Sequence, residues 1–394
     1  MKYDFDEVIN RGSDPYSFSV KWSQEGLMDR FHLKEMPDDM ICLQIADMDF
    51  KTAPEIIEDL KKVSEHGIFG YSQINDEYRQ AVVNWYHKRQ NWDFDKEDIL
   101  FVPGTHMAIF EIVMNLTNVG DGIIIPTPSY PYHGDIEAQQ RQYVCVKMNC
   151  DQGYYTMDYD ALEKACQKEE NKLMIIIHPH NPTGRIWSDE ELLKIADICR
   201  RNDVIMISDE VHSDIIREGL EFHPMMKVVG PEGLITCTAV NKTFNLAGLS
   251  CTNLIVHDQK IKERLNLYEL LPSPFGIQAV ISAYNKCDAW VDELNQYLDR
   301  NLEFAIDFID HRLTKAKCRK PDGGYIIWLD LSGYGLSDEE LHHRIFDEAH
   351  IIIQPGSNFD DTELKGQVYR LCLPSPLSVI QEAFARLERV LEKA

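Results

Sequence analysis

Short apolar runs recur through the middle of the chain and are separated by segments with helical spacing. Most of the runs have no polar face, so each is expected to be a strand covered on both sides. The runs lie at residues 99–102, 122–125, 143–148, 173–177, 204–207, 234–238 and 254–256. This alternation predicts an α/β fold with a large, mostly parallel sheet between helices. In such sheets, ligands bind outside the carboxyl ends of the strands.

The length of the chain and a change of pattern near residue 286 indicate two domains. A chain of 394 residues is too long for one small core, which favours a large domain with a smaller partner. From residue 286 onward, a long helical run leads into an alternation of short strands and helices. We therefore expect a large domain over residues 45–285. Residues 1–44 and 286–394 are expected to form a small α+β domain, with the N-terminal residues as an arm.

The net charge indicates which partners are disfavoured, and the cysteine pattern indicates the expected cellular compartment. The formal net charge is −25 at pH 7, so nucleic acids and anionic membranes would be repelled. No apolar run approaches the ~20 residues that a membrane helix requires, and the charged N-terminus lacks a signal-peptide core. The ten cysteines are scattered without a C-x-x-C pair. These features predict a cytoplasmic protein with reduced thiols.

Lys242, Asp209 and Asn181 each follow one of the apolar runs. The carboxyl ends of parallel strands meet at one edge of a sheet, so we expect these three side chains to converge there. A poorly hydrated lysine favours its neutral amine and can act as a Schiff-base nucleophile. A buried aspartate is costly without a cationic partner, so a cation is expected beside Asp209.

Gly104, Thr105 and His106 follow strand 99–102 and open a helical run. A helix N-terminus offers unpaired N–H groups and a positive dipole end, so this turn is a candidate phosphate cradle. The chain has no G-x-G-x-x-G and no G-K-[ST], which excludes a nicotinamide dehydrogenase or a P-loop site of the usual type. No cluster of cysteines and carboxylates supports a metal site.

The same stretches resemble the fold-type I pyridoxal-phosphate enzymes of the class I/II aminotransferase superfamily. Within it, the chain is most similar to the branch of cystathionine β-lyase and related cysteine-conjugate C–S lyases. The resemblance extends almost from end to end, and its motifs lie at residues 19–22, 45–50, 66–71, 178–185, 208–212, 236–249 and 323–330. It implies a large domain that binds pyridoxal 5'-phosphate and a smaller α+β domain.

The resemblance also implies the roles of the residues that hold the cofactor. Lys242 corresponds to the lysine that binds the cofactor covalently and later removes the Cα proton of the substrate. Asp209 keeps the ring nitrogen protonated, Asn181 binds the ring 3-oxygen, and Tyr130 stacks on the ring. His212 is expected to contribute through a contact with Asp209. The remaining expected cofactor contacts are Thr238 and the cradle residues Gly104, Thr105 and His106.

Further roles concern the substrate and a second subunit. Arg370 corresponds to the arginine that clamps the α-carboxylate of the substrate, and an arginine inside an apolar strand is rarely a simple surface charge. Asn181 and the main chain of Ala46 border the same substrate. Tyr71 is expected to reach across a homodimer interface and to donate its hydroxyl to the cofactor phosphate of the partner subunit.

The branch resemblance favours a C–S β-lyase that cleaves L-cystathionine or a related cysteine S-conjugate to a thiol, pyruvate and ammonia. An aminotransferase is the main alternative, because transamination shares every step up to the carbanion. A third interpretation is a cofactor-binding regulatory protein, but the joint presence of Lys242, Asp209, Asn181 and Arg370 speaks against it.

Three features depart from the branch pattern. Asn241 precedes the lysine where serine is common, and Cys372 stands two residues after Arg370 where asparagine is usual. The segment 355–361 is unusually acidic for a substrate entrance. These departures concern the choice of thioether substrate rather than the cofactor.

Overall fold

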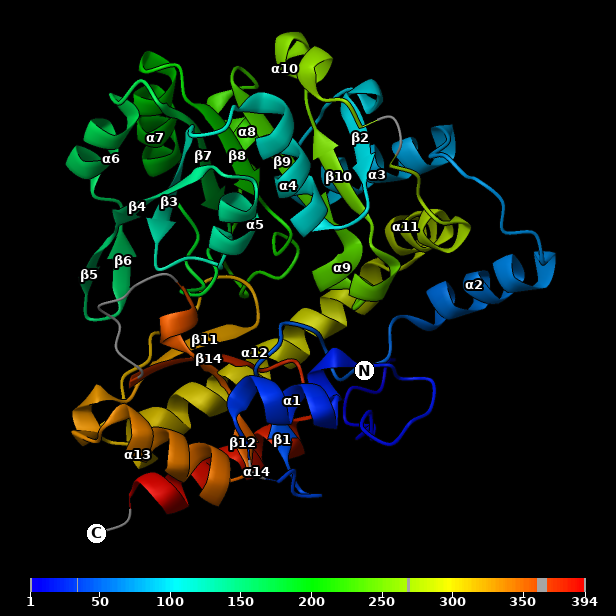
Figure 1. The fold of residues 1–394 in the computed structure, drawn as a ribbon. Coiled ribbons are helices and arrows are strands. Elements are labelled where there is room, and N and C mark those ends of the chain that lie inside the picture. Colours follow the sequence, from blue (N-terminus) through cyan, green and yellow to red (C-terminus); the bar gives the residue numbers. More distant parts are fainter. Residues whose placement is uncertain (1, 34, 268–269, 360–366, 393–394) are drawn as a thin grey trace.

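A seven-stranded sheet forms the centre of the large part of the chain in the computed structural model, which describes residues 2–33, 35–267, 270–359 and 367–392 (Figure 1). The order of its strands is β2-β10-β9-β8-β7-β3-β4. Only β10 runs antiparallel to its neighbours. Its strands are β2 (Ile99–Val102), β3 (Gly122–Thr127), β4 (Gln142–Lys147), β7 (Asn171–Ile177), β8 (Ile205–Asp209), β9 (Leu234–Ala239) and β10 (Thr252–Ile255). The sequence prediction of a mostly parallel α/β sheet is confirmed.

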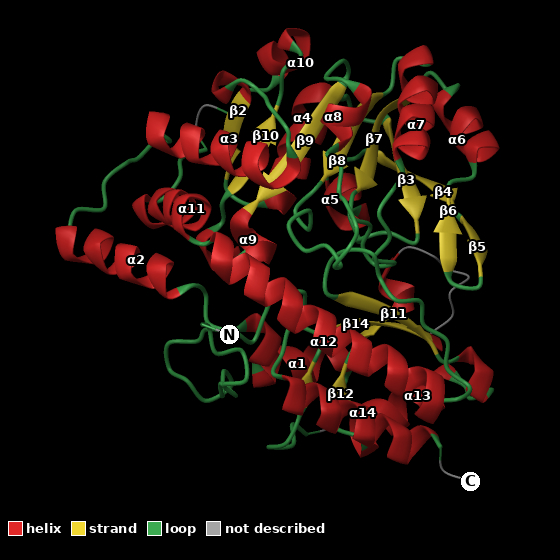
Figure 2. Cartoon of the chain, turned by 180° about the vertical axis from the view of Figure 1, so that it is seen from behind, coloured by secondary structure: helices red, strands yellow, loops and turns green. Residues whose placement is uncertain are grey.

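Helices cover both faces of this sheet (Figure 2). Apolar side chains of one group of helices share a buried cluster with one face of the sheet, and those of a second group share a cluster with the other face. The first group consists of α2 (Pro54–His66), α3 (Asp76–Gln90), α6 (Tyr159–Cys166), α7 (Asp189–Arg201), α8 (Met225–Val229) and α11 (Pro274–Lys286). The second group consists of α4 (Thr105–Leu116), α5 (His133–Ala138) and α10 (Gln259–Arg264).

Local sequence signals account for where several of these helices begin. The Ser188 side chain accepts a hydrogen bond from the Glu191 N–H, and the Glu191 side chain reaches back to the Ser188 N–H. This capping box opens α7, and its S-x-x-E pattern at residues 188–191 is a sequence signature of a helix N-terminus. Asn75 caps α3 in a similar way, through its side-chain oxygen and the Tyr78 N–H. Pro54 occupies the first turn of α2, where its missing N–H costs nothing.

The C-terminal part forms a second layer with an antiparallel sheet of order β11-β14-β13. The N-terminal strand β1 (Ile41–Cys42) pairs in parallel with β12 (Ile351–Ile352), which ties the first residues of the chain to this layer. The other elements are α1 (Gln24–Phe31), β11 (Ile326–Asp330), α13 (Asp338–His342), a π-helical turn (His343–Glu348), β13 (Gln354–Pro355), β14 (Val368–Cys372) and α14 (Leu377–Leu391). The pairing of β1 with β12 agrees with an N-terminal arm that joins the C-terminal module. The division into residues 45–285 and residues 1–44 with 286–394 stays a prediction.

The long helix α12 (Asp288–Arg312) connects the two layers (Figures 1 and 2). Its first half contributes Trp290, Leu294 and Tyr297 to the core of the large sheet. Its second half contributes Leu302 and Ile309 to a separate core that includes α1 and α14. One rigid helix therefore sets the position of one layer relative to the other.

Some details differ from the sequence prediction. The apolar run at 41–45 predicts a short strand, but only two of its residues form one. Helical spacing over 338–349 predicts one helix, whereas the segment divides into α13 and the π-helical turn. A small hairpin of β5 (Asn149–Asp151) and β6 (Tyr154–Thr156) was not anticipated. Within the described residues, every helix is too short or too polar to serve as a membrane span. Asp360 and Asp361, from the acidic segment 355–361, lie outside the described residues.

Candidate active site

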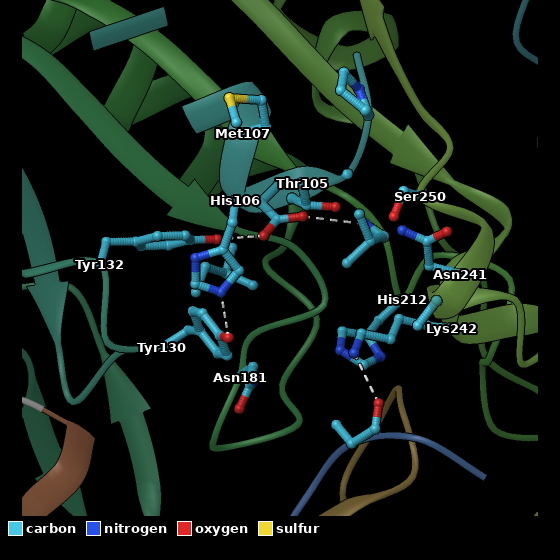
Figure 3. A pocket seen from close by; sticks show the side chains of 17 residues that line it. Thr105, His106, Met107, Tyr130, Tyr132, Asn181, His212, Asn241, Lys242 and Ser250 are labelled. Atoms are coloured by element: carbon cyan, nitrogen blue, oxygen red, sulfur yellow. Dashed lines mark hydrogen bonds between the residues drawn. The ribbon is translucent and has the colours of Figure 1, made fainter. Parts of the chain in front are cut away.

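A cavity of about 310 Å³ lies at the carboxyl ends of β7, β8 and β9 (Figure 3). This position is the one expected for a ligand site in a parallel sheet. Most of the candidate residues line it, although they come from six separate stretches of the chain. Those that line it are Ala46, Gly104, Thr105, His106, Tyr130, Asn181, Asp209, His212 and Lys242.

Lys242 projects into the cavity from α9 (Val240–Thr243), the short helical turn that follows β9. Its Nζ donates a hydrogen bond to the main-chain oxygen of Ala46 at 2.7 Å. Burial lowers the pKa of the Lys242 amine, and the charge of Arg370 lowers it further. The neutral, nucleophilic form of the amine is therefore favoured relative to an exposed lysine.

Asp209 is buried at the last position of β8. Its Oδ2 accepts a hydrogen bond from the Tyr132 hydroxyl, and its Oδ1 accepts one from the Val211 N–H at 3.3 Å. Burial raises the pKa of Asp209, and the bond from Tyr132 is the largest opposing effect. Its hydrogen-bond partners in the described chain are thus neutral groups, and a bound cation would relieve the cost of burying the carboxylate.

Gly104 precedes α4 with a φ of 99°, a conformation that suits glycine. A Cβ built at this position would meet no protein atom within 4 Å, so the space beside the turn is open. The Thr105 hydroxyl shares a hydrogen bond with the Thr252 hydroxyl at 3.2 Å, which fixes the first turn of the helix. The turn has the shape and the dipole direction of an anion cradle.

Arg370 lies in the middle of β14, in the second layer, and is almost completely buried. It does not line the cavity, but its guanidinium reaches a residue that does. Its Nη1 donates to the Asn181 side-chain oxygen at 3.4 Å, and its Nη2 donates to the Gln44 carbonyl at 2.7 Å. Within the described residues, Nε has no hydrogen-bond partner. The hydrogen-bond partners of this buried cation in the described chain are thus an amide and a carbonyl, which leaves it suited to a ligand carboxylate.

His212 lines the cavity, but its contact is not the expected one. Its ring packs edge-on against Tyr325 at a centroid distance of 5.5 Å, and in the described part of the chain its Nδ1 has no hydrogen-bond partner. Burial lowers the pKa of His212 to about 3, so the imidazole is neutral at pH 7. The hydrogen bond to Asp209 comes from Tyr132 instead, because that hydroxyl reaches the carboxylate from the loop after β3.

Thr238 and Tyr71 lie away from the cavity. Side chains alternate between the two faces of a strand, and Cys237 on β9 packs on the face covered by α4. Thr238 therefore points to the opposite face, where it is fully buried. Tyr71 lies on the connection between α2 and α3 and is 99% exposed. In a single chain, neither side chain contributes to the cavity.

Tyr132 and Ser250 line the cavity and were not anticipated. Tyr132 stands two residues after Tyr130 in the same loop, so its position after a buried strand was a usable signal. Ser250 has a left-handed backbone (φ 53°) that follows the small-residue run after Lys242. Asn241 also lines the cavity, and its side-chain oxygen lacks a hydrogen-bond partner in the described residues.

The donor set fits pyridoxal phosphate. The cofactor has an aldehyde for an amine, a ring nitrogen for a carboxylate, and a phosphate for a helix N-terminus. Lys242, Asp209 and the turn at Gly104 supply these three partners around one cavity. The polar atoms without partners in the described chain, on His212 and Asn241, lie at the same place.

Comparison with known proteins gives a consistent result. The family model for aminotransferases of class I and II matches residues 38–387. Cystathionine beta-lyase PatB of Bacillus subtilis is 34% identical over 384 residues, which cover 95% of this chain and 96% of PatB. Cystalysin from Treponema denticola, whose crystal structure contains pyridoxal 5'-phosphate, is 33% identical with a TM-score of 0.92, over 100% of this chain and 99% of cystalysin. The pyridoxal-phosphate-bound C–S lyase from Staphylococcus hominis is 30% identical with a TM-score of 0.91, over 99% and 98% of the two chains.

Proposed function

The chain belongs to the class I and II aminotransferase family, and we propose that it is a pyridoxal-phosphate-dependent C–S β-lyase. Its substrate would be L-cystathionine or a related cysteine S-conjugate, and its products a thiol, pyruvate and ammonia. The observation that carries the proposal is that the Lys242 amine and the Asp209 carboxylate line one cavity, while the buried Arg370 guanidinium donates a hydrogen bond to Asn181, which also lines it. The names of the relatives, cystathionine beta-lyase and C–S lyase, support this choice of reaction.

Several residues would hold the cofactor. Lys242 would bind it through its amine, and the N-terminus of α4 would receive the phosphate. Asp209 would hold a proton on the ring nitrogen, since a carboxylate beside that nitrogen favours its charged form. Asn181 and Tyr130 would bind the 3-oxygen and stack on the ring. Thr238 stays a prediction for this group of contacts, because it lies outside the cavity.

When bound, pyridoxal phosphate supplies an electron sink that stabilises a carbanion at Cα of an amino acid. Arg370 would bind the α-carboxylate of the substrate and orient the Cα–H bond toward Lys242. The lowered pKa of Lys242 suits its amine to take the Cα proton near neutral pH. Loss of the thiolate from Cβ then completes the elimination.

Transamination by the same protein is the second candidate, because it requires the same residues up to removal of the Cα proton. A product assay separates the two. Purified protein with added cofactor is incubated with cystathionine and S-alkyl cysteines, and pyruvate and free thiol are measured without any keto acid. Product formation without an acceptor supports the lyase, whereas product that requires an added keto acid supports the aminotransferase.

The matched control for this assay is Lys242→Ala. We expect a loss of roughly 10²–10⁴-fold or more in turnover, because the general base and the covalent anchor are both removed. If the wild-type protein binds the cofactor but releases nothing from any cysteine conjugate, a regulatory role gains support instead.

We also propose that the protein works as a cytoplasmic homodimer in which Tyr71 completes the phosphate site of the partner subunit. The exposure of Ile68 (69%), Phe69 (56%) and Tyr71 (99%) on one connection supports a covered surface. Sedimentation analysis tests the dimer. Tyr71→Phe tests the contact, since it should weaken cofactor affinity and leave the dimer intact.

A further inference from the structure

Asp135, His106 and Tyr130 form a hydrogen-bonded chain at the edge of the cavity. Figure 3 shows the part of this chain that joins His106 to Tyr130. The Tyr130 hydroxyl lies 2.6 Å from His106 Nε2, and His106 Nδ1 lies 2.7 Å from Asp135 Oδ2. The three residues come from the loop after β3, the first turn of α4 and the helix α5. None of the roles assigned so far uses the imidazole of His106, because its part in the cradle depends on its main-chain N–H.

We propose that this chain is a proton relay in which Tyr130 protonates the departing thiolate. The inference rests on the proposed lyase function and adds a general acid to it. Stacking on the cofactor would use the face of the Tyr130 ring, whereas the relay uses its hydroxyl, so one residue can serve both purposes.

The proton transfers balance as follows. The C–S bond breaks, and its electron pair stays on sulfur. The sulfur takes the proton of the Tyr130 hydroxyl as an S–H bond forms. The Tyr130 oxygen takes the Nε2 proton of a doubly protonated His106, whose Nδ1–H is held by Asp135. His106 then regains a proton from water, and its 57% exposed side chain in the isolated chain allows this.

The surroundings of Tyr130 keep its hydroxyl protonated. Burial raises the pKa of Tyr130, the charges of Asp209 and Asp135 raise it, and those of Arg370 and Arg30 oppose them. The net direction is upward, so the phenol holds its proton at neutral pH. A free alkyl thiolate is a weaker base than this phenolate, so the transfer to sulfur takes place together with the transfer from His106 Nε2 to the Tyr130 oxygen.

Lys242 is the competing proton donor, since it carries a proton after the Cα–H bond breaks. Two features favour Tyr130 for the leaving group. The Lys242 amine is held by the Ala46 carbonyl, whereas Tyr130 has a refilling path that leads to solvent through His106. A separate donor also lets Lys242 keep its proton for the later steps.

The test is a leaving-group series of S-aryl and S-alkyl cysteines whose thiols differ in acidity. A stable thiolate needs no proton, whereas a basic alkyl thiolate does. Tyr130→Phe keeps the ring for stacking, and we expect kcat/KM to fall by roughly 10²–10⁴-fold for S-alkyl substrates and to change little for S-(4-nitrophenyl)cysteine. For His106→Gln and Asp135→Asn, we expect the same selectivity with a smaller loss, on the order of tenfold.

Two measurements separate a relay from a merely structural effect. Exchange of the substrate Cα hydrogen with deuterated solvent should persist in all three variants, because it precedes the loss of the thiolate. Cofactor affinity, followed by absorbance, should be unchanged in His106→Gln and Asp135→Asn. His133→Asn and Glu137→Gln, on the same helix as Asp135, are the matched controls and should behave as wild type.

An unchanged leaving-group dependence in Tyr130→Phe would overturn the relay and assign the proton to Lys242 or water. In His106→Gln, the glutamine can donate a hydrogen bond but cannot pass on a proton. If kcat/KM of this variant depends on the acidity of the leaving thiol as in the wild type, transfer through His106 is refuted. A wild-type protein that releases no pyruvate from any member of the series contradicts the proposed function itself, which is a different outcome.

Discussion

The carboxylate of Asp214 accepts a hydrogen bond from the Thr243 hydroxyl at 3.0 Å, directly beside Lys242 in the sequence. The same carboxylate accepts one from Trp85 Nε1 at 2.9 Å, and all three side chains are buried. The turn that carries the reactive lysine is therefore fixed from behind by a group outside the cavity.

Asp214→Ala should reduce both stability and turnover. Two buried donors lose their acceptor, and we expect the free energy of unfolding to fall by about 1–3 kcal/mol. Turnover should fall as well, because the α9 turn loses its anchor. Chemical denaturation and the pyruvate assay measure the two effects. Asp292→Ala, which removes an exposed carboxylate paired with Arg89, is the control and should cost less than about 1 kcal/mol.

Tyr132→Phe should change the pH dependence of cofactor binding. The Tyr132 hydroxyl stabilises the Asp209 carboxylate, so its removal raises the pKa of Asp209 beyond the increase that burial already causes. The acid limb of the affinity profile should then move to higher pH, by about one to two units for a hydrogen bond to a charged group. Titration with pyridoxal phosphate at several pH values measures the shift. Tyr284→Phe, a buried tyrosine bonded to Tyr86, should leave the limb in place.

Arg370→Lys should weaken substrate binding while leaving the cofactor bound. A lysine cannot make the paired hydrogen bonds of a guanidinium to a carboxylate. We expect kcat/KM to fall roughly 10–100-fold, mainly through KM. Steady-state kinetics with cystathionine give the result, with Arg386→Lys on α14 as the control. A variant with normal KM would show that the α-carboxylate is bound elsewhere.

Lys21→Met should destabilise the protein and change its response to acid. Lys21 is fully buried, and its Nζ lies 2.8 Å from Asp49 Oδ2. Burial alone would raise the pKa of Asp49, but Lys21, together with Ser375 and Arg11, outweighs it and the net shift is downward. The pair therefore contributes stability at neutral pH that is lost as the pH falls below about 4 toward the lowered pKa.

Removal of the lysine leaves a buried carboxylate, and we expect a cost of about 3–5 kcal/mol at pH 7 that becomes smaller in acid. Thermal or urea unfolding at pH 7 and in acid measures the change. The control is Lys51→Met, whose partner Glu7 is exposed, and its effect should stay below about 1 kcal/mol. An equal loss at both pH values would exclude the charge pair as the cause.

Much of the fold could be predicted because each strand of the main sheet is a local apolar run. The limits of β2 agree with the sequence prediction to the residue, and the long helical run expected after residue 286 is α12. The hairpin β5–β6 could not be predicted, because its strands are short and mostly exposed and no apolar period marks them. The π-helical turn after α13 could not be predicted either, because its apolar residues keep the spacing of an ordinary helix.

The site could be predicted where a reactive side chain lies at or just after the end of a predicted strand, as for Lys242 and Asp209. It was not predictable where contacts join distant segments. Nothing near Asp209 in the sequence indicates that its hydrogen bond comes from Tyr132 and not from His212, three residues away. The relay of Asp135 and His106 is likewise invisible in sequence, since it depends on the packing of α5 against α4.

The main-chain oxygen of Ala46 receives hydrogen bonds from both Lys242 and Tyr325, at 2.7 Å and 3.1 Å. This single atom joins segments from the beginning, the middle and the last quarter of the chain. During synthesis on the ribosome, Lys242 emerges long before Tyr325 and therefore cannot reach its final surroundings until Tyr325 has also emerged. The surroundings that make the Lys242 amine reactive are therefore complete only after the segment that carries Tyr325 has been made.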